Sequence, residues 1–95
     1  MTVCCTPLFE TQLKALLAPL AASDPRAAKS VKLYLDTVLM NLPSKAHKYK
    51  PSRFFDDERV RDALHQEWVI PFYYDDTNDA YVILGITERN EQSLS

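Results

Sequence analysis

The first half of the chain carries its apolar residues at helical spacing. One stripe recurs at intervals of three and four residues, through Leu8, Phe9, Leu13, Leu16, Leu17 and Leu20. A second stripe consists of Ala28, Val31, Leu35, Val38, Leu39 and Leu42. This periodicity predicts two amphipathic helices, each with one face buried in a core.

Two residue pairs indicate where these helices begin. Thr6-Pro7 and Asp24-Pro25 each place a capping side chain before a proline, whose missing N–H costs nothing in the first turn. We expect Pro19 to fray or end the first helix and Pro43 to stop the second, because a proline inside a helix removes a backbone hydrogen bond. The short turn between the helices predicts an antiparallel hairpin.

The second half of the chain changes to strand-like sequence. Residues 59–65 alternate imperfectly between polar and apolar, and residues 67–74 and 80–87 are rich in aromatic and β-branched side chains. The polar run 75–79 supplies a turn between the last two, which predicts an antiparallel meander. Residues 2–5 predict a short first strand ahead of the helices.

One proline and several aromatic residues stand out in the strand region. Pro71 cannot donate to a strand ladder, which predicts a bulge or an edge position. The bulky aromatic side chains are expected to pack within the sheet and not to stack on nucleic-acid bases. They are Trp68, Phe72, Tyr73, Tyr74 and Tyr81.

The predicted fold class is therefore α+β, with the element order β-α-α-β-β-β. A short N-terminal strand and a helical hairpin pack on one face of a curled antiparallel sheet. A chain of 95 residues is long enough for one core and too short for two. We expect a single domain over residues 1–95, in which residues 88–95 form a loose polar tail.

Charge and cysteine content narrow the class of protein. The formal net charge is -2 and the isoelectric point about 5.6, so no global positive field attracts nucleic acid or an anionic membrane. Cys4 and Cys5 would point to opposite faces of a strand, which fits reduced thiols in a cytoplasm. The sequence shows neither a secretory signal nor an apolar run long enough for a membrane span. We expect a cytoplasmic protein with no membrane partner.

The positions of the histidines and of the single glycine indicate whether the chain binds a metal or a cofactor. His47 and His65 lie eighteen residues apart without further ligands at metal-binding spacing. Gly85 stands alone, so no glycine-rich loop for a phosphate is present. We expect no metal and no cofactor.

The most basic segment of the chain is the sequence KAHKYKPSRFFDD, residues 45–57. In one interpretation it contacts phosphate or an acidic partner segment, with Pro51 holding the cations at a fixed spacing. In the other it is a solvated connection whose aromatic residues fill the end of the core. We favour the first, in which the binding residues are Lys45, Lys48, Lys50, Arg53 and, from the following strand, Arg61.

The order of elements and several local patterns resemble the RelE/ParE superfamily of toxins from bacterial type II toxin-antitoxin modules. The relevant segments are Val60-Arg61, residues 68–74 and residues 81–86. In that family an arginine opens the second strand, an aromatic third strand runs into an acidic turn, and polar or basic residues follow the fourth strand. Arg61, the turn 75–79 and Arg89 occupy those places.

The resemblance implies a growth-inhibiting toxin, as in plasmid stabilisation, neutralised by a cognate antitoxin. RelE-like members are ribosome-dependent mRNA endonucleases, and ParE-like members inhibit DNA gyrase, so whether this chain is an enzyme stays open. RNA cleavage needs cations and proton carriers around the phosphate. The candidate cations are Lys48, Lys50, Arg53, Arg61 and Arg89, and the candidate proton carriers are His47, His65 and Glu88.

The sequence departs from the RNA-cleaving members in two ways, and both favour the gyrase-directed branch. No aromatic residue or histidine follows the last strand, where Thr87-Glu88-Arg89-Asn90 stands instead, and the chain is acidic where ribosome-directed nucleases are basic. We therefore expect a ParE-like toxin that does not cleave RNA. The alternatives are the mRNA endonuclease, with the ribosome and mRNA as partners, and a non-toxic binding or adaptor protein on the same fold.

Overall fold

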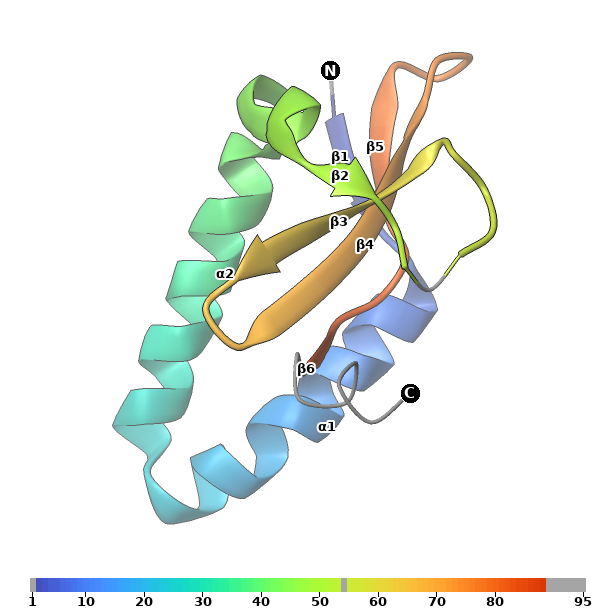
Figure 1. Cartoon of the computed structure of the whole chain (residues 1–95). Helices are drawn as coiled ribbons and strands as arrows, with labels where there is room; N and C mark the ends of the chain where they lie inside the picture. Colours follow the sequence, from blue (N-terminus) through green and yellow to red (C-terminus); the bar gives the residue numbers. More distant parts are fainter. Residues whose placement is uncertain (1, 54, 89–95) are drawn as a thin grey trace.

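The computed structural model describes residues 2–53 and 55–88 (Figure 1). The described elements follow the predicted order, with a 3-10 helix and two short strands added. They are β1 (Thr2–Cys5), α1 (Pro7–Ser23), α2 (Pro25–Lys45), η1 (Ala46–Lys48), β2 (Lys50–Pro51), β3 (Val60–His65), β4 (Trp68–Asp75), β5 (Ala80–Ile83) and β6 (Thr87–Glu88).

One sheet contains all of these strands, in the order β1-β5-β4-β3-β2, and β6 pairs with β4. The predicted α+β class and the helical hairpin are confirmed. The sheet is mixed, however, because β1 runs parallel to β5 while the other pairs are antiparallel. Parallel pairing requires a long connection between the two strands, and the helical hairpin lies within that connection.

Both helices begin where the sequence predicts. The Thr6 hydroxyl oxygen accepts the N–H of Phe9 at 3.2 Å, and the Asp24 carboxylate accepts the N–H of Ala27 at 3.1 Å. The Thr6 hydroxyl also donates to the carbonyl of Ile83 at 2.8 Å, which ties the start of α1 to the end of β5. The same residue therefore caps a helix and fixes that helix against the sheet.

The expectation that prolines end the helices is wrong at both positions. Pro19 lies inside α1, which continues to Ser23, and Pro43 lies inside α2, which continues to Lys45. Leu42, directly before Pro43, is buried at 1% exposure, and Ala46, directly after the end of α2, is buried at 7%. Because packing on both sides holds the backbone in place, the loss of one hydrogen bond does not end the helix.

The core lies between the helical hairpin and one face of the sheet. Trp68, Ile70 and Phe72, at alternate positions of β4, are all buried on this face. The aromatic prediction is thereby confirmed for Trp68 and Phe72, whereas Tyr74 is 41% exposed. The helices contribute Phe9, Leu13, Leu35, Val38, Leu39 and Leu42.

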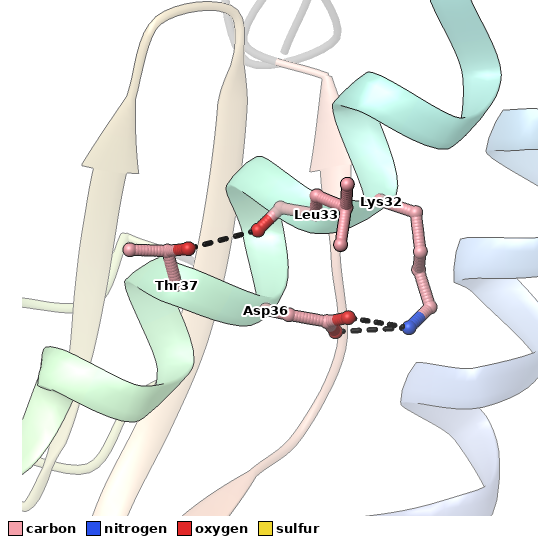
Figure 2. A network of polar contacts seen from close by, with 4 residues as sticks. All are labelled: Lys32, Leu33, Asp36 and Thr37. Carbon is pink, nitrogen blue, oxygen red and sulfur yellow. Dashed lines mark hydrogen bonds and ion pairs between the residues drawn. The ribbon is translucent and has the colours of Figure 1, made fainter. Parts of the chain in front are cut away.

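Polar side chains of α2 form contacts within the helix itself. Figure 2 shows Lys32 and Asp36 on the side of α2 that faces α1, with the ammonium 2.9 Å from the carboxylate. Thr37 donates its hydroxyl proton to the carbonyl of Leu33 at 3.0 Å, so its side chain is satisfied within the helix. Within the described residues, neither helix is long and apolar enough to cross a membrane.

The predicted strand 80–87 is interrupted opposite Pro71. Phe72 pairs with Ile83 and Val69 pairs with Thr87, so two residues of β4 face the three residues 84–86. The extra residue makes a bulge, which confirms one of the two alternatives given for Pro71; the edge alternative is wrong, since β4 is an inner strand. Leu84 still donates its N–H to the Pro71 carbonyl at 2.9 Å.

Gln12 of α1 completes the bulge. Its side-chain oxygen accepts the N–H of buried Ile86 at 2.9 Å. A Cβ atom added at Gly85 would lie 2.4 Å from that same oxygen, closer than such atoms approach each other. The single glycine of the chain therefore allows α1 to reach the interrupted strand. Glu88, expected to begin the loose tail, lies in β6, and residues 89–95 lie outside the described part.

We predict that Gly85→Ala destabilises the protein by roughly 1–3 kcal/mol, because the new methyl group displaces Gln12 from the Ile86 N–H. Gln12→Ala should cost about 1 kcal/mol by leaving that donor unpaired. Urea unfolding of both single variants and of the double variant provides the measurement. The double variant should lose less than the sum of the two, because both changes break the same bond. A Gly85→Ala protein as stable as the wild type would contradict this explanation.

Candidate functional site

The basic segment after α2 is held against β3 by Arg61. One nitrogen of its guanidinium, Nη1, donates to the carbonyl of Ala46 and to the carbonyl of Tyr49, each at 3.2 Å. These two carbonyls lie at the beginning and just after the end of η1. The arginine that the sequence marks as a phosphate ligand thus also fixes the backbone of the segment beside it.

His65 holds the same segment at a second point. Its Nε2 atom lies 2.5 Å from the hydroxyl of Tyr49, and its Nδ1 atom lies 3.4 Å from the hydroxyl of Tyr34 on α2. The Tyr49 ring also packs edge-on against Phe72, with centroids 5.8 Å apart. Since Arg61 and His65 are four residues apart on one strand, both point to the face of the sheet that carries the helices.

The environment of His65 disfavours its charged form. Burial lowers the pKa of His65 below its ordinary value of 6.5, and the nearby Lys45 ammonium lowers it further. Burial, and secondarily Tyr34, raises the pKa of Tyr49. Both partners are therefore neutral near pH 7. His65, proposed from the sequence as a proton carrier, is engaged on both ring nitrogens by tyrosines.

The predicted cations do not gather on one face. Lys50 lies opposite Asp62 in the β2–β3 ladder, and Pro51 lies opposite Arg61. Because successive strand residues point to opposite faces, Lys50 is on the side of Asp62 and Arg61 is on the side of the helices. The side chains of the other predicted cations, Lys45, Lys48 and Arg53, are exposed.

Acidic residues partly balance this segment, as the alternative interpretation expects. Asp62 is only 5% exposed and accepts the N–H of Arg53 at 3.0 Å, and its second oxygen has no partner in the described structure. Asp57 pairs with Arg59 at 2.9 Å. Tyr49 packs against the core, while Phe55 is 41% exposed and Phe54 lies outside the described residues. The segment combines features of both interpretations.

An open pocket of about 350 Å³ lies beside η1, and we call it the aromatic pocket. It is lined by Ala46, His47, Glu58, Arg59, Arg61, Phe72, Tyr74 and Tyr81. Of the predicted site residues that the structure describes, His47 and Arg61 line it. The three aromatic residues were expected to serve packing alone. In the sequence, the alternate spacing of Phe72 and Tyr74 is the signal that places these two on one face of a strand, and the structure pairs Tyr74 with Tyr81 of β5.

Glu88, another candidate catalytic residue, lies away from the aromatic pocket. Glu88 pairs with Trp68 at the start of β4, whereas Tyr74, which lines the pocket, is near the end of that strand. Arg89 lies outside the described residues. Over residues 2–53 and 55–88, no group of three or more histidine, cysteine, aspartate or glutamate residues could hold a metal ion.

We predict that Arg61→Met lowers the free energy of unfolding by about 1–3 kcal/mol, because two backbone carbonyls lose a charged donor. Arg59→Met is the matched control, since that guanidinium is exposed and, within the described residues, pairs with the neighbouring Asp57 carboxylate. Its unfolding midpoint in urea should stay near that of the wild type. Equal midpoints for the two variants would show that Arg61 does not hold η1.

We predict that the protein loses stability through His65 as the pH falls below 6.5, the ordinary pKa of the side chain. Its pKa is lower in the folded than in the unfolded state, so the unfolded chain binds more protons in this range. The contribution is complete above pH 6.5 and is lost as the pH falls toward the folded-state pKa. His65→Gln should flatten the pH dependence of thermal unfolding, and His47→Gln should keep it. An unchanged slope in His65→Gln would contradict this assignment.

Comparisons with known proteins identify the family. The model of the ParE toxin of the type II toxin-antitoxin system parDE matches residues 3–93. No curated protein sequence matches the chain significantly. A chain in the crystal structure of the toxin-antitoxin complex RelBE2 from Mycobacterium tuberculosis is 21% identical, with a TM-score of 0.64, over 93% of this chain and 96% of that one. That likeness shows the fold. Because the family model covers nearly the whole sequence, the protein belongs to the ParE toxin family of type II toxin-antitoxin systems.

Proposed function

We propose that this toxin inhibits DNA gyrase by binding to it, without cleaving RNA, and that a cognate antitoxin neutralises it in the cytoplasm. The described strands form one sheet, and the helices pack on it around one core. This supports the proposal that residues 1–95 act as a single domain.

The arrangement of the candidate catalytic residues carries the proposal. Cleavage through the ribose 2'-hydroxyl requires a base, an acid and cations around one phosphate. Lys50 and Arg61 lie on opposite faces of the sheet, and the His65 ring is engaged by two tyrosines. His47 and Glu58 line the pocket together with Arg61, Arg59 and the phenol groups of Tyr74 and Tyr81. Because the candidate catalytic residues do not surround one phosphate position, their arrangement supports a toxin that acts by binding over one that acts by catalysis.

The rigid presentation of the basic segment supports a binding role as well. The side chains of Arg61 and His65 on β3 form hydrogen bonds with residues 46–49, and Lys50 and Pro51 pair with β3 as a strand. A surface that is ordered before binding loses less entropy when a partner binds to it. The exposed side chains of Lys45 and Lys48 are thus displayed from a fixed backbone.

We predict that the purified toxin blocks DNA supercoiling by purified gyrase and that its induction arrests growth while messenger RNA stays intact. Co-expression of the antitoxin should restore growth. The measurements are a supercoiling gel and primer extension on cellular transcripts. Transcripts cut on translating ribosomes, together with uninhibited gyrase, would favour the endonuclease and contradict the proposal. Normal growth on induction without the antitoxin would favour a non-toxic binding protein.

A further inference from the structure

The aromatic pocket contains hydrogen-bond donors that no described residue uses. Arg61 employs only Nη1 in its bonds to the two backbone carbonyls. Its Nε and Nη2 groups have no acceptor among the described residues, although the side chain is half-buried and lines the pocket. Such a guanidinium edge fits a carboxylate or a phosphate, which can accept two parallel hydrogen bonds from it.

Aromatic rings line the pocket next to this guanidinium. The Tyr81 ring lies 5.0 Å from that of Tyr74 and 6.2 Å from that of Phe72, measured between centroids. The Tyr74 hydroxyl donates to Asp79 at 2.6 Å, which fixes the position of the Tyr74 ring. Rings held in this way offer an apolar surface on which a planar side chain can pack with little loss of entropy.

The charges at the rim fit one anionic group better than a polyanion. Arg59 is paired with Asp57, so its charge is largely balanced. Glu58 adds a negative charge at the pocket, and Arg61 adds the positive charge that remains available. A nucleic-acid backbone would bring several phosphates to a site with almost no net positive charge, in a chain with a net charge of -2. A single carboxylate on a peptide avoids that repulsion.

We propose that the aromatic pocket binds a segment of the toxin's protein target in which a carboxylate side chain neighbours an aromatic one. The carboxylate accepts hydrogen bonds from Nε and Nη2 of Arg61, and the aromatic side chain packs on Tyr81 and Tyr74. This inference rests on the proposed function, because it assigns the pocket to the target that the toxin inhibits.

The target suits this pocket better than the antitoxin does. A permanent partner usually buries a large apolar area. The most exposed large apolar side chains on the helices are Leu8 at 57%, Leu33 at 60% and Met40 at 79%, and none of them lines the aromatic pocket. The pocket has a volume of about 350 Å³ and is lined by both aromatic and charged side chains, which suits a contact made in addition to the antitoxin interface.

A pair of dipeptides tests the chemistry directly. Binding of N-acetyl-Asp-Trp-amide to the full-length toxin is measured by NMR titration, with N-acetyl-Asn-Trp-amide as the neutral control. We expect the aspartate peptide to shift the Arg61 Nε–H and Tyr81 ring signals and to bind at least about fivefold more tightly than the control. Equal affinities, or shifts confined to another surface, would overturn the proposal.

Two variants test the residues without touching the bonds that hold η1. Glu58→Gln should tighten binding of the aspartate peptide by removing a like charge, and Tyr81→Leu should weaken binding of both peptides. Lys29→Gln, on the exposed part of α2, is the matched control and should change neither affinity. Unchanged affinity in Tyr81→Leu, with its fold intact by circular dichroism, would also overturn the proposal.

An assay in cells separates this inference from the proposed function. Tyr81→Leu should lose growth arrest while the purified variant still binds the antitoxin. Loss of antitoxin binding with growth arrest retained would assign the pocket to the antitoxin and contradict the inference. If the wild type binds the aspartate peptide and arrests growth but leaves gyrase active, the gyrase assignment fails, while the pocket remains the site for another target.

Discussion

The attachment of residues 46–49 to β3 is the constraint on which the functional surface depends. Arg61 satisfies two carbonyls of this segment, and His65 binds the Tyr49 hydroxyl four residues further along the same strand. Without these contacts the connection after α2 would be a solvated loop, since its lysines face water. With them, the short helix forms one wall of the aromatic pocket, and the aromatic residues of β4 and β5 form another. One pair of side chains thus gives both a fixed backbone and a defined pocket.

The same constraint limits the chemistry that the site can perform. Arg61 uses part of its hydrogen-bonding capacity for structure, and His65 is neutral between two tyrosines because burial and Lys45 lower its pKa. Groups committed in this way are poorly placed to transfer protons to a substrate. The arrangement is consistent with a ParE toxin that acts through contact with another protein, in which shape and a few well-placed charges determine specificity.

Much of the fold follows from the sequence because its signals are local. The capping pairs at Thr6 and Asp24 and the apolar stripes act within one or two turns, and they predict the helical hairpin correctly. Pro19 and Pro43 mislead because tertiary packing outweighs a lost hydrogen bond. The pocket could not be predicted for another reason: it forms only when β3, β4 and β5 pair with one another. Lys50 and Arg61 are both cations of the same predicted binding site, yet the register of β2 on β3 places them on opposite faces of the sheet. The strand β2 has only two residues, both exposed, so it carries no alternating apolar pattern from which its register could be predicted.

The most direct test of a preordered binding surface is hydrogen exchange, measured by mass spectrometry on the toxin alone and mixed with gyrase. A segment already fixed by Arg61 and His65 should exchange its backbone amide protons slowly at residues 46–50 in the free toxin. The strands of the aromatic pocket, β3 to β5, should then gain further protection when gyrase is added. Rapid exchange of residues 46–50 in the free protein, or protection by gyrase only on the outer faces of the helices, would contradict the account.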